Sequence, residues 1–342
     1  MSTSRKDDYD TGGRNKDACS STSILPNALG SATAGIISRI FTHPLDTAKA
    51  RLQAVGTPYS GPVEAITLTF RAEGLRGLYG GFRTVLLGGT PGTVLYLCSY
   101  DALKDYTAAV SSPADARTSS IHGPFVHFAC GMVAETIACI IYVPVDVIKE
   151  RMQVQKMVAA SSSAMSPAPY NNGWDALRQI LRNEGIAGIY RGYGATLASF
   201  GPFSAFYFAI YEQLQSWTAS TTAENERVEV NDSPASFGRV VLNSCAAGAF
   251  ASWLTSPLDM AKLRLQVQRQ KASAPSTSTT TALTYNGMVD CLRRTFRAEG
   301  FRGLFRGAGA RVLHFAPATT ITMSCYESFR VLFDNRLNRS QQ

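Results

Sequence analysis

The chain has 342 residues, of which 45% are hydrophobic and 17% are charged, and its formal net charge is +8. This composition excludes an intrinsically disordered chain, a collagen-like repeat and a small disulfide-rich scaffold. The mean hydropathy of −0.03 is that of a soluble protein, whereas the low charge content with 28 Gly and 15 Pro is typical of membrane helices. The local sequence decides between these two indications.

Residues 1–24 are polar and lack the apolar stretch of a secretory signal. The acids Asp7, Asp8 and Asp10 argue against a cleaved transit peptide, because such peptides are poor in acidic residues. We therefore expect a disordered N-terminal tail. The seven cysteines form no C-x-x-C pattern, so we expect neither a zinc site nor a disulfide framework, and we expect a reducing compartment.

One charged motif occurs three times, in the form P-x-D-x-x-K-x-R-x-Q. Its copies are HPLDTAKARLQ (43–53), VPVDVIKERMQ (143–153) and SPLDMAKLRLQ (256–266). Each is followed by an E-G motif, namely EGLRGLYGG (73–81), EGIAGIYRG (184–192) and EGFRGLFRG (299–307). Because the same features recur in the same order, the chain is built of tandem repeats.

The repeats divide the chain into six parts. These are an N-terminal tail (1–24), repeat 1 (25–110), repeat 2 (121–217), a polar linker (218–236), repeat 3 (237–335) and a C-terminal tail (336–342). The Ser/Thr/Pro-rich segments 158–169 and 271–284 read as loops.

Each repeat contains two weakly charged stretches of about 20 residues, the length that crosses a ~30 Å hydrocarbon core as a helix. They cover about 25–43, 82–100, 124–143, 192–211, 238–256 and 308–326. The alternative is six buried helices of a soluble bundle. Proline and glycine inside these stretches favour the membrane, where neighbouring helices compensate for them. Between the stretches, residues 175–185 and 290–300 have the pattern of short amphipathic helices on a membrane surface. We therefore predict an all-α membrane protein.

A lone D-x-x-K is usually an i,i+3 surface pair of little consequence. Three copies at equivalent helix ends predict a ring instead, in which the acid of one repeat pairs with the lysine of the next and closes a pore. We call this the first ring; its members are Asp46, Lys49, Asp146, Lys149, Asp259 and Lys262. The prolines Pro44, Pro144 and Pro257 are expected to kink these helices toward the axis. The glutamines Gln53, Gln153 and Gln266, one turn beyond each lysine, are expected to hydrogen-bond the pairs.

The second helix of each repeat carries a complementary set of charges, in YDALK (100–104), YEQLQ (211–215) and YESFR (326–330). We call it the second ring; its members are Asp101, Lys104, Glu212, Glu327 and Arg330, with Tyr100, Tyr211 and Tyr326 as expected braces. In repeat 2, Gln215 replaces the basic residue. Two rings that are never both tightly closed predict alternating access, and parallel repeats around an axis along the membrane normal are a known transporter plan.

Together these motifs resemble those of the mitochondrial carrier family over about residues 25–335. The resemblance implies a pseudo-threefold barrel of six tilted helices with three short matrix helices, located in the mitochondrial inner membrane with both termini toward the intermembrane space. The first ring would be the matrix gate and the second ring the cytoplasmic gate. It also implies a monomer without a cofactor, and cardiolipin binding at Arg191, Gly192, Arg306 and Gly307. In repeat 1 Gly80 replaces the basic residue of that motif.

The same resemblance places substrate contacts two and three residues before each proline of the second helices. With the cavity-facing charges Arg39 and Glu135, the predicted contacts are Gly88, Gly89, Ser199, Phe200, His314 and Phe315. The segment around Glu135 and Cys139 is similar to that of S-adenosylmethionine carriers, and an aromatic platform can stack an adenine or meet a sulfonium. Iron or another divalent metal, through His314 and Cys139, is the competing hypothesis, and amino acids or nucleotides remain open.

Other classes of protein have less support in the sequence. No nucleophile–base set or metal cluster of an enzyme occurs, so we predict no catalytic residues and no metal site. A non-transporting membrane scaffold is the stronger alternative, because Ser199, Phe200 and Gln215 depart from the family pattern. The positive charge lies largely beside the apolar stretches, as in Arg178 and Arg293, where it can meet anionic lipid rather than nucleic acid.

Overall fold

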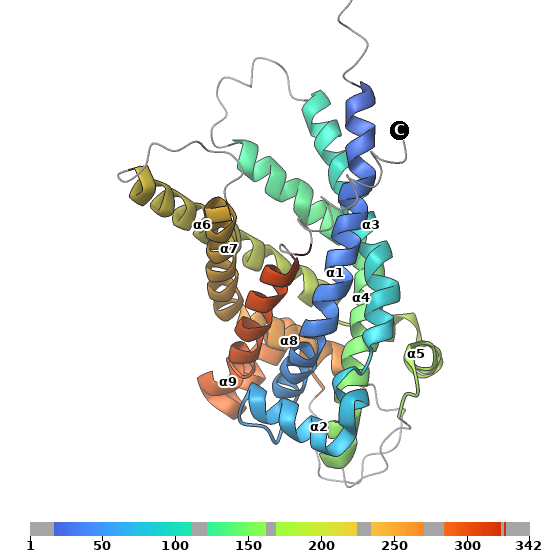
Figure 1. The fold of residues 1–342 in the computed structure, drawn as a ribbon. Helices are drawn as coiled ribbons and strands as arrows, with labels where there is room; N and C mark the ends of the chain where they lie inside the picture. Colours follow the sequence, from blue (N-terminus) through green and yellow to red (C-terminus); the bar gives the residue numbers. More distant parts are fainter. Residues whose placement is uncertain are drawn as a thin grey trace, which may run out of the picture. The chain divides into compact units, whose positions relative to one another are not determined.

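The computed structural model describes residues 17–110, 122–161, 169–223, 234–269, 284–322 and 325. All regular secondary structure in these segments is helical. The helices are α1 (Asp17–Gln53), α2 (Pro62–Leu78), α3 (Phe82–Val110), α4 (His122–Ser161), α5 (Gly173–Ile189), α6 (Tyr193–Ala223), α7 (Pro234–Leu254), α8 (Ser256–Val267) and α9 (Met288–Leu304), followed by helical residues 308–322 (Figure 1).

Two predicted boundaries differ from the observed ones. Helix α1 begins at Asp17, so residues 17–24, which we expected in the disordered tail, are helical. Helices α4 and α6 likewise continue to Ser161 and Ala223, into the expected loop and linker. Residues 1–16 and most of the two loops and the linker lie outside the described residues.

Phe41–Thr319 forms one compact unit, and the sites described below lie within it. Here α3 packs against α4, and α6 packs against α7 and α8. The close approach of α3 and α4 depends on small residues, because a Cβ at Gly88 or Gly92 would overlap Val145 or Tyr142. Such small-residue contacts are typical of membrane helices, which pack without a hydrophobic driving force between them.

The motif prolines are accommodated in two ways. Pro144 lies inside the continuous helix α4. In repeat 3 the helix ends at Leu254 and a new helix begins at Ser256, with Pro257 in its first turn. Proline suits that position because the first helical N–H groups have no intrahelical partner.

Several helices expose large apolar side chains that suit contact with lipid. Leu87, Phe208 and Leu242 are 77%, 57% and 67% exposed. The segment Phe128–Met157 of α4 has the length and apolar composition of a membrane span, and among the described residues it alone meets this criterion. The other predicted spans are interrupted by glycines, prolines and polar residues, which lower their hydropathy.

The short helices α2, α5 and α9 share a local design. The glycine of each E-G motif, at Gly74, Gly185 and Gly300, has a φ of 65–68°, which bends the helix and requires glycine. At the other end, the acid three residues beyond the N-cap accepts the backbone N–H that precedes the cap. For Asp175 this hydrogen bond from Asn171, 3.0 Å long, lowers the pKa of the carboxyl group.

The arginine of each charged motif pairs with the glutamate of the E-G motif in the same repeat. The side-chain distances are 2.6 Å for Arg51–Glu73, 2.5 Å for Arg151–Glu184 and 2.7 Å for Arg264–Glu299. Each arginine makes two parallel hydrogen bonds to its glutamate and is at most 2% exposed. We call these contacts the arginine–glutamate pairs.

Each of these arginines also reaches another repeat. The Nε atoms of Arg51, Arg151 and Arg264 donate to the backbone carbonyls of Gln153, Gln266 and Gln53 at 3.0, 2.9 and 3.1 Å. The linkage is cyclic, since each repeat donates to one neighbour and accepts from the other. It therefore holds the three charged motifs at one level and attaches a short helix to each.

We expect Arg151→Ala to lower the free energy of unfolding by about 3–5 kcal/mol, because the buried carboxylate of Glu184 loses both of its hydrogen bonds from Arg151 and keeps only the more distant Arg191. The exposed pair Arg294–Asp290 on α9 is a matched control, and Arg294→Ala should cost less than about 1 kcal/mol. Thermal unfolding of the purified protein in detergent measures both. Equal melting temperatures for the two variants would contradict the assignment.

Candidate functional site

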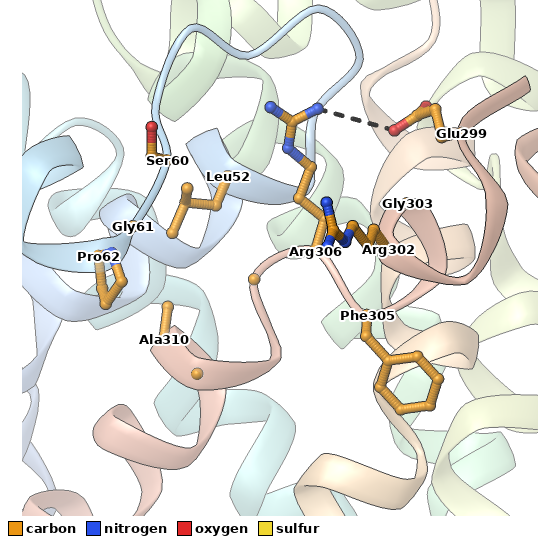
Figure 2. A pocket seen from close by; sticks show the side chains of 12 residues that line it. Leu52, Ser60, Gly61, Pro62, Glu299, Arg302, Gly303, Phe305, Arg306 and Ala310 are labelled. Atoms are coloured by element: carbon orange, nitrogen blue, oxygen red, sulfur yellow. Dashed lines mark ion pairs between the residues drawn. The ribbon is translucent and has the colours of Figure 1, made fainter.

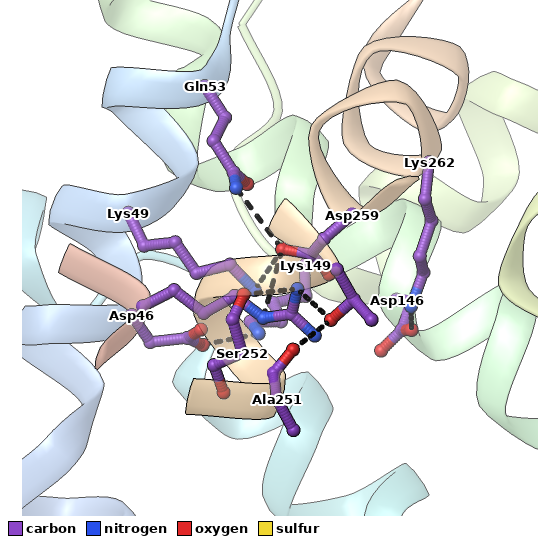
Figure 3. Close-up of polar contacts among 11 residues, drawn as sticks. Asp46, Lys49, Gln53, Asp146, Lys149, Ala251, Ser252, Asp259 and Lys262 are labelled. Carbon is purple, nitrogen blue, oxygen red and sulfur yellow. Dashed lines mark hydrogen bonds and ion pairs between the residues drawn. The ribbon is translucent and has the colours of Figure 1, made fainter. Parts of the chain in front are cut away.

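The first ring is formed by ion pairs that join the three charged motifs (Figure 3). Lys49 lies 2.8 Å from Asp259, Lys262 lies 2.7 Å from Asp146, and Lys149 pairs with Asp46. The acid of each repeat thus meets the lysine of the next, and the last acid meets the first lysine. No repeat satisfies its own charges, so the ring closes only when all three motifs meet.

The helix explains why these side chains converge. An aspartate and a lysine three residues apart lie on the same face of a helix, and the arginine–glutamate pairs hold the three faces at one level. The lysine and aspartate side chains of the ring are 11–28% exposed. Attraction between charges is stronger there than in bulk water, because the local dielectric constant is lower.

One of the three glutamines hydrogen-bonds an ion pair as predicted, and the other two do not. The amide of Gln53 donates to Asp259 at 3.2 Å, as a brace would. Gln153 and Gln266 donate instead to the hydroxyls of Thr47 and Thr196, at 3.2 and 3.4 Å. These hydroxyls lie in a neighbouring repeat, so the two glutamines link repeats without touching the ion pairs. The physical reason is that repeats 1 and 2 place a hydroxyl within reach of each amide.

The second ring is open in the part of the chain that the structure describes. Asp101, Lys104 and Glu212 are exposed and form no ion pair with one another. Tyr100 and Tyr211 stack on the tyrosines one turn earlier, Tyr96 and Tyr207, with ring centroids 6.3 and 6.1 Å apart. The predicted members Tyr326, Glu327 and Arg330 lie outside the described side chains.

The predicted substrate contacts fall into two groups. Gly88 packs against Val145 of α4 and Gly89 is buried, so these two positions serve helix packing. Glu135 and Ser199 are 9% and 6% exposed. Phe200 and His314 are half-buried. Arg39 belongs to the other unit of the chain.

Phe315 is part of an aromatic cluster that sequence analysis missed. Its ring centroid lies 6.0 Å from that of Phe203 and 6.2 Å from that of Tyr207. Phe203, Tyr207 and Tyr211 follow one another at four-residue spacing on α6 and stack along it. That spacing was the available signal, because residues four apart share a helix face. The cluster offers a π surface of the kind that binds aromatic or cationic groups.

The predicted lipid residues of repeat 3 line a cavity of about 490 Å³ (Figure 2). Its wall includes Arg302, Arg306 and Gly307 on one side and Gly61 and Pro62, at the start of α2, on the other. Arg306 donates to the carbonyl of Thr57 at 3.1 Å, which ties the two sides together. Glu299 also lines the cavity, 3.7 Å from Arg306. The two arginines outnumber this acid, and together with the helix N-terminus they supply positive potential and N–H donors, which favours an anion.

Repeat 2 places its second cation as repeat 3 does, where Arg306 lies 3.7 Å from Glu299, and repeat 1 differs. In repeat 2, Arg191 lies 3.5 Å from Glu184 and donates to the carbonyl of Gln268. In repeat 1, where Gly80 replaces the base, Lys156 of repeat 2 lies 3.6 Å from Glu73. The cation missing from the motif is therefore supplied from the neighbouring repeat, a contact that sequence analysis did not foresee.

Comparison with known proteins agrees with the threefold arrangement. The family model described as mitochondrial carrier protein matches residues 20–110, 122–221 and 233–337. Mitochondrial substrate carrier family protein E of Dictyostelium discoideum is 33% identical, over 91% of this chain and 97% of its own length. The chloroplastic nicotinamide adenine dinucleotide transporter 1 of Arabidopsis thaliana is 30% identical, over 90% and 91%. The mitochondrial S-adenosylmethionine carrier protein of Xenopus tropicalis is 29% identical, over 89% and 94%.

The three matches cover most of the chain, and each coincides with one charged motif, one E-G motif and the helices that bear them. The named relatives are transporters or carriers; two of the names give a substrate, and these two substrates differ at similar identity. The chain belongs to the mitochondrial carrier family, whose members are membrane-embedded transporters of small molecules and not enzymes.

Proposed function

We propose that this chain carries its solute across the mitochondrial inner membrane by alternating access, with the first ring as the matrix gate and the second ring as the cytoplasmic gate. The observation that carries the proposal is the closed cycle of ion pairs Lys49–Asp259, Lys149–Asp46 and Lys262–Asp146. Together with the exposed charges of the second ring, it describes a carrier closed toward the matrix and ready to accept solute from the other side.

Opening requires that all three ion pairs separate together, because they form one cycle. Binding of the solute has to supply the free energy that separates the ion pairs. It can do so only if the solute binds the intermediate conformation between the two states more tightly than it binds either end state. Formation of the ion pairs of the second ring then offsets part of the free energy lost when the first ring opens. In repeat 2, Gln215 replaces the base of that ring, so we infer a weaker cytoplasmic gate.

For the solute, we favour S-adenosylmethionine or a similar adenine-containing zwitterion. The buried carboxylate of Glu135 suits a cationic group, and the aromatic cluster around Phe203, Tyr207 and Phe315 suits an adenine ring. A divalent metal is less well supported, since within the described residues no three His, Cys, Asp or Glu side chains come together as ligands. Amino acids and nucleotides remain alternatives.

We further propose that the cavity at Arg306 and Gly307 binds the phosphates of cardiolipin or another anionic phospholipid, and that Arg191 and Gly192 form an equivalent site. Gly192 and Gly307 have φ values of 82° and 85°, and a side chain at either would meet Gln266 or Gln53. Glycine therefore keeps the backbone close to the neighbouring repeat. We place both termini toward the intermembrane space and take the carrier to be a monomer.

The gate assignment predicts loss of transport when one ion pair is broken. We expect Lys49→Ala, Lys149→Ala or Asp259→Ala to lower uptake of S-adenosylmethionine into proteoliposomes at least about tenfold, because each leaves a charge unpaired and shifts the equilibrium between the two states.

The reversed pair Asp46→Lys with Lys149→Asp should recover part of the uptake that Lys149→Ala loses. Arg293→Ala, an exposed position on α9, is the matched control and should transport normally. Normal uptake in all three single variants would disprove the gate. Absence of uptake by the unmodified protein, with this and other solutes, would instead favour a scaffold.

The lipid proposal predicts that cardiolipin raises the melting temperature of the protein in detergent, and that Arg306→Gln reduces this increase by about half or more, since a charged hydrogen-bond donor to phosphate is lost. Arg293→Gln removes the same charge from the surface of α9 outside the cavity, so it controls for the general attraction of anionic lipid and should reduce the increase less. An equal increase in both variants would place the lipid elsewhere.

A further inference from the structure

Threefold symmetry separates charges that every repeat needs from charges that one repeat adds. The first ring and the arginine–glutamate pairs recur in all three repeats. Arg311 does not: counted from the proline of each second helix, its equivalents are Val85 in repeat 1 and Thr196 in repeat 2. Opening and closing of the first ring, in which all three repeats take part alike, therefore do not require the cation of Arg311.

Arg311 nevertheless lies against the first ring. Its Nε is 3.7 Å from the Oδ2 of Asp259, and its side chain is 13% exposed. The same oxygen already accepts from Lys49 at 2.8 Å and from Gln53 at 3.2 Å. At 3.7 Å the third contact is electrostatic and too long for a hydrogen bond. The single negative charge of Asp259 thus has two cations beside it, Lys49 and Arg311.

Among the described residues, only the Nη1 atom of Arg311 donates hydrogen bonds, while Nε faces the carboxylate of Asp259 without bonding it. Nη1 donates to the carbonyl of Ser252 at 3.3 Å and to the hydroxyl of Thr255 at 3.1 Å, at the break between α7 and α8. Within the described part of the chain, Nε and Nη2 donate no hydrogen bond. These two N–H groups are parallel, and they form the fork that binds a carboxylate or phosphate with two hydrogen bonds.

The surroundings of this fork suit an organic anion. The guanidinium carbon lies 5.4 Å from the centroid of the Phe203 ring, which belongs to the aromatic cluster with Tyr207 and Phe315. Among the described residues, the hydroxyl of Ser252, a residue 1% exposed, has no hydrogen-bond partner. A buried hydroxyl without a partner is costly, so the residue that holds Arg311 in place is short of one polar contact.

We propose that Arg311 binds the anionic group, a carboxylate or a phosphate, of the transported solute, beside an aromatic surface that holds the rest of the molecule. This inference rests on the transport function proposed above. It also couples binding to the gate, because an anion on Arg311 removes a cation from Asp259 and places a negative charge near it. Binding thereby weakens the ion pair between repeats 3 and 1.

The test compares two pairs of solutes, and the members of each pair differ only in the anionic group: S-adenosylmethionine with its decarboxylated analogue, and AMP with adenosine. Apparent affinity is measured as half-saturation of uptake into proteoliposomes, for the unmodified protein, Arg311→Gln and Arg311→Lys. For the transported pair, removal of the anionic group should weaken the affinity of the unmodified protein about ten- to a hundredfold.

Arg311→Gln should bind both members of that pair equally weakly, since the group that distinguished them is gone. Arg311→Lys should keep part of the difference, because it keeps the charge but loses the fork. A purely structural role would instead lower transport of both solutes and preserve the ratio between them. Arg293→Gln, on the surface of α9, should preserve the affinities and the ratio.

The results distinguish the two proposals. If the unmodified protein transports S-adenosylmethionine or AMP, and Arg311→Gln still prefers that solute over its partner without the anionic group, the site on Arg311 is wrong and the transport function stands. If the unmodified protein transports none of the four solutes, the assignment of an adenine-containing solute fails and this site fails with it. If the protein transports AMP with higher affinity than S-adenosylmethionine, the anionic group bound by Arg311 is a phosphate. If it transports S-adenosylmethionine with higher affinity, that group is a carboxylate.

Discussion

The arrangement depends on ion pairs that no repeat can form alone. Each charged motif brings one aspartate and one lysine to the same helix face, and each finds its partner in a different repeat. Because the pairs form a cycle, breaking one leaves the other two to hold all three motifs together. Opening is therefore cooperative, because a gate with one broken ion pair is still held closed by the other two.

Two layers of charge lie next to each other and differ in how easily they separate. Arginine forms one layer; Arg151, for example, makes two hydrogen bonds to glutamate and two to backbone carbonyls, with almost no exposure. Lysine forms the first ring, with a single contact and 15–18% exposure. A planar guanidinium fixes the geometry of its partner, whereas an ammonium is a mobile and strongly hydrated point charge. The chemistry of the two side chains thus assigns permanent attachment to one layer and separation to the other.

The sequence was sufficient to predict the repeats, the six apolar stretches and the residues of the first ring, because these depend on spacing along one helix. It failed where a side chain chooses between partners in other repeats. Gln153 and Gln266 reach threonine hydroxyls, Glu73 receives a lysine from repeat 2, and Gly88 packs against Val145. The buried arginines were visible in the motif, but only the folded chain shows that the E-G glutamates are their partners. The tail boundary failed for another reason, since polar composition does not prevent a helix that begins at Asp17.

Departures from symmetry are the natural place for solute recognition. A solute without threefold symmetry cannot make equal contacts with three repeats, so the residues that distinguish it must occur in one repeat only. Arg311 occurs only in repeat 3. Glu135 occurs only in repeat 2, and its equivalents in repeats 1 and 3 are Gly35 and Gly248. One is a cation and the other an acid, and the aromatic side chains of α6 lie against the first. A solute that carries both charges and a flat ring would use all three features, which is the physical argument for a zwitterion with an adenine rather than a simple anion.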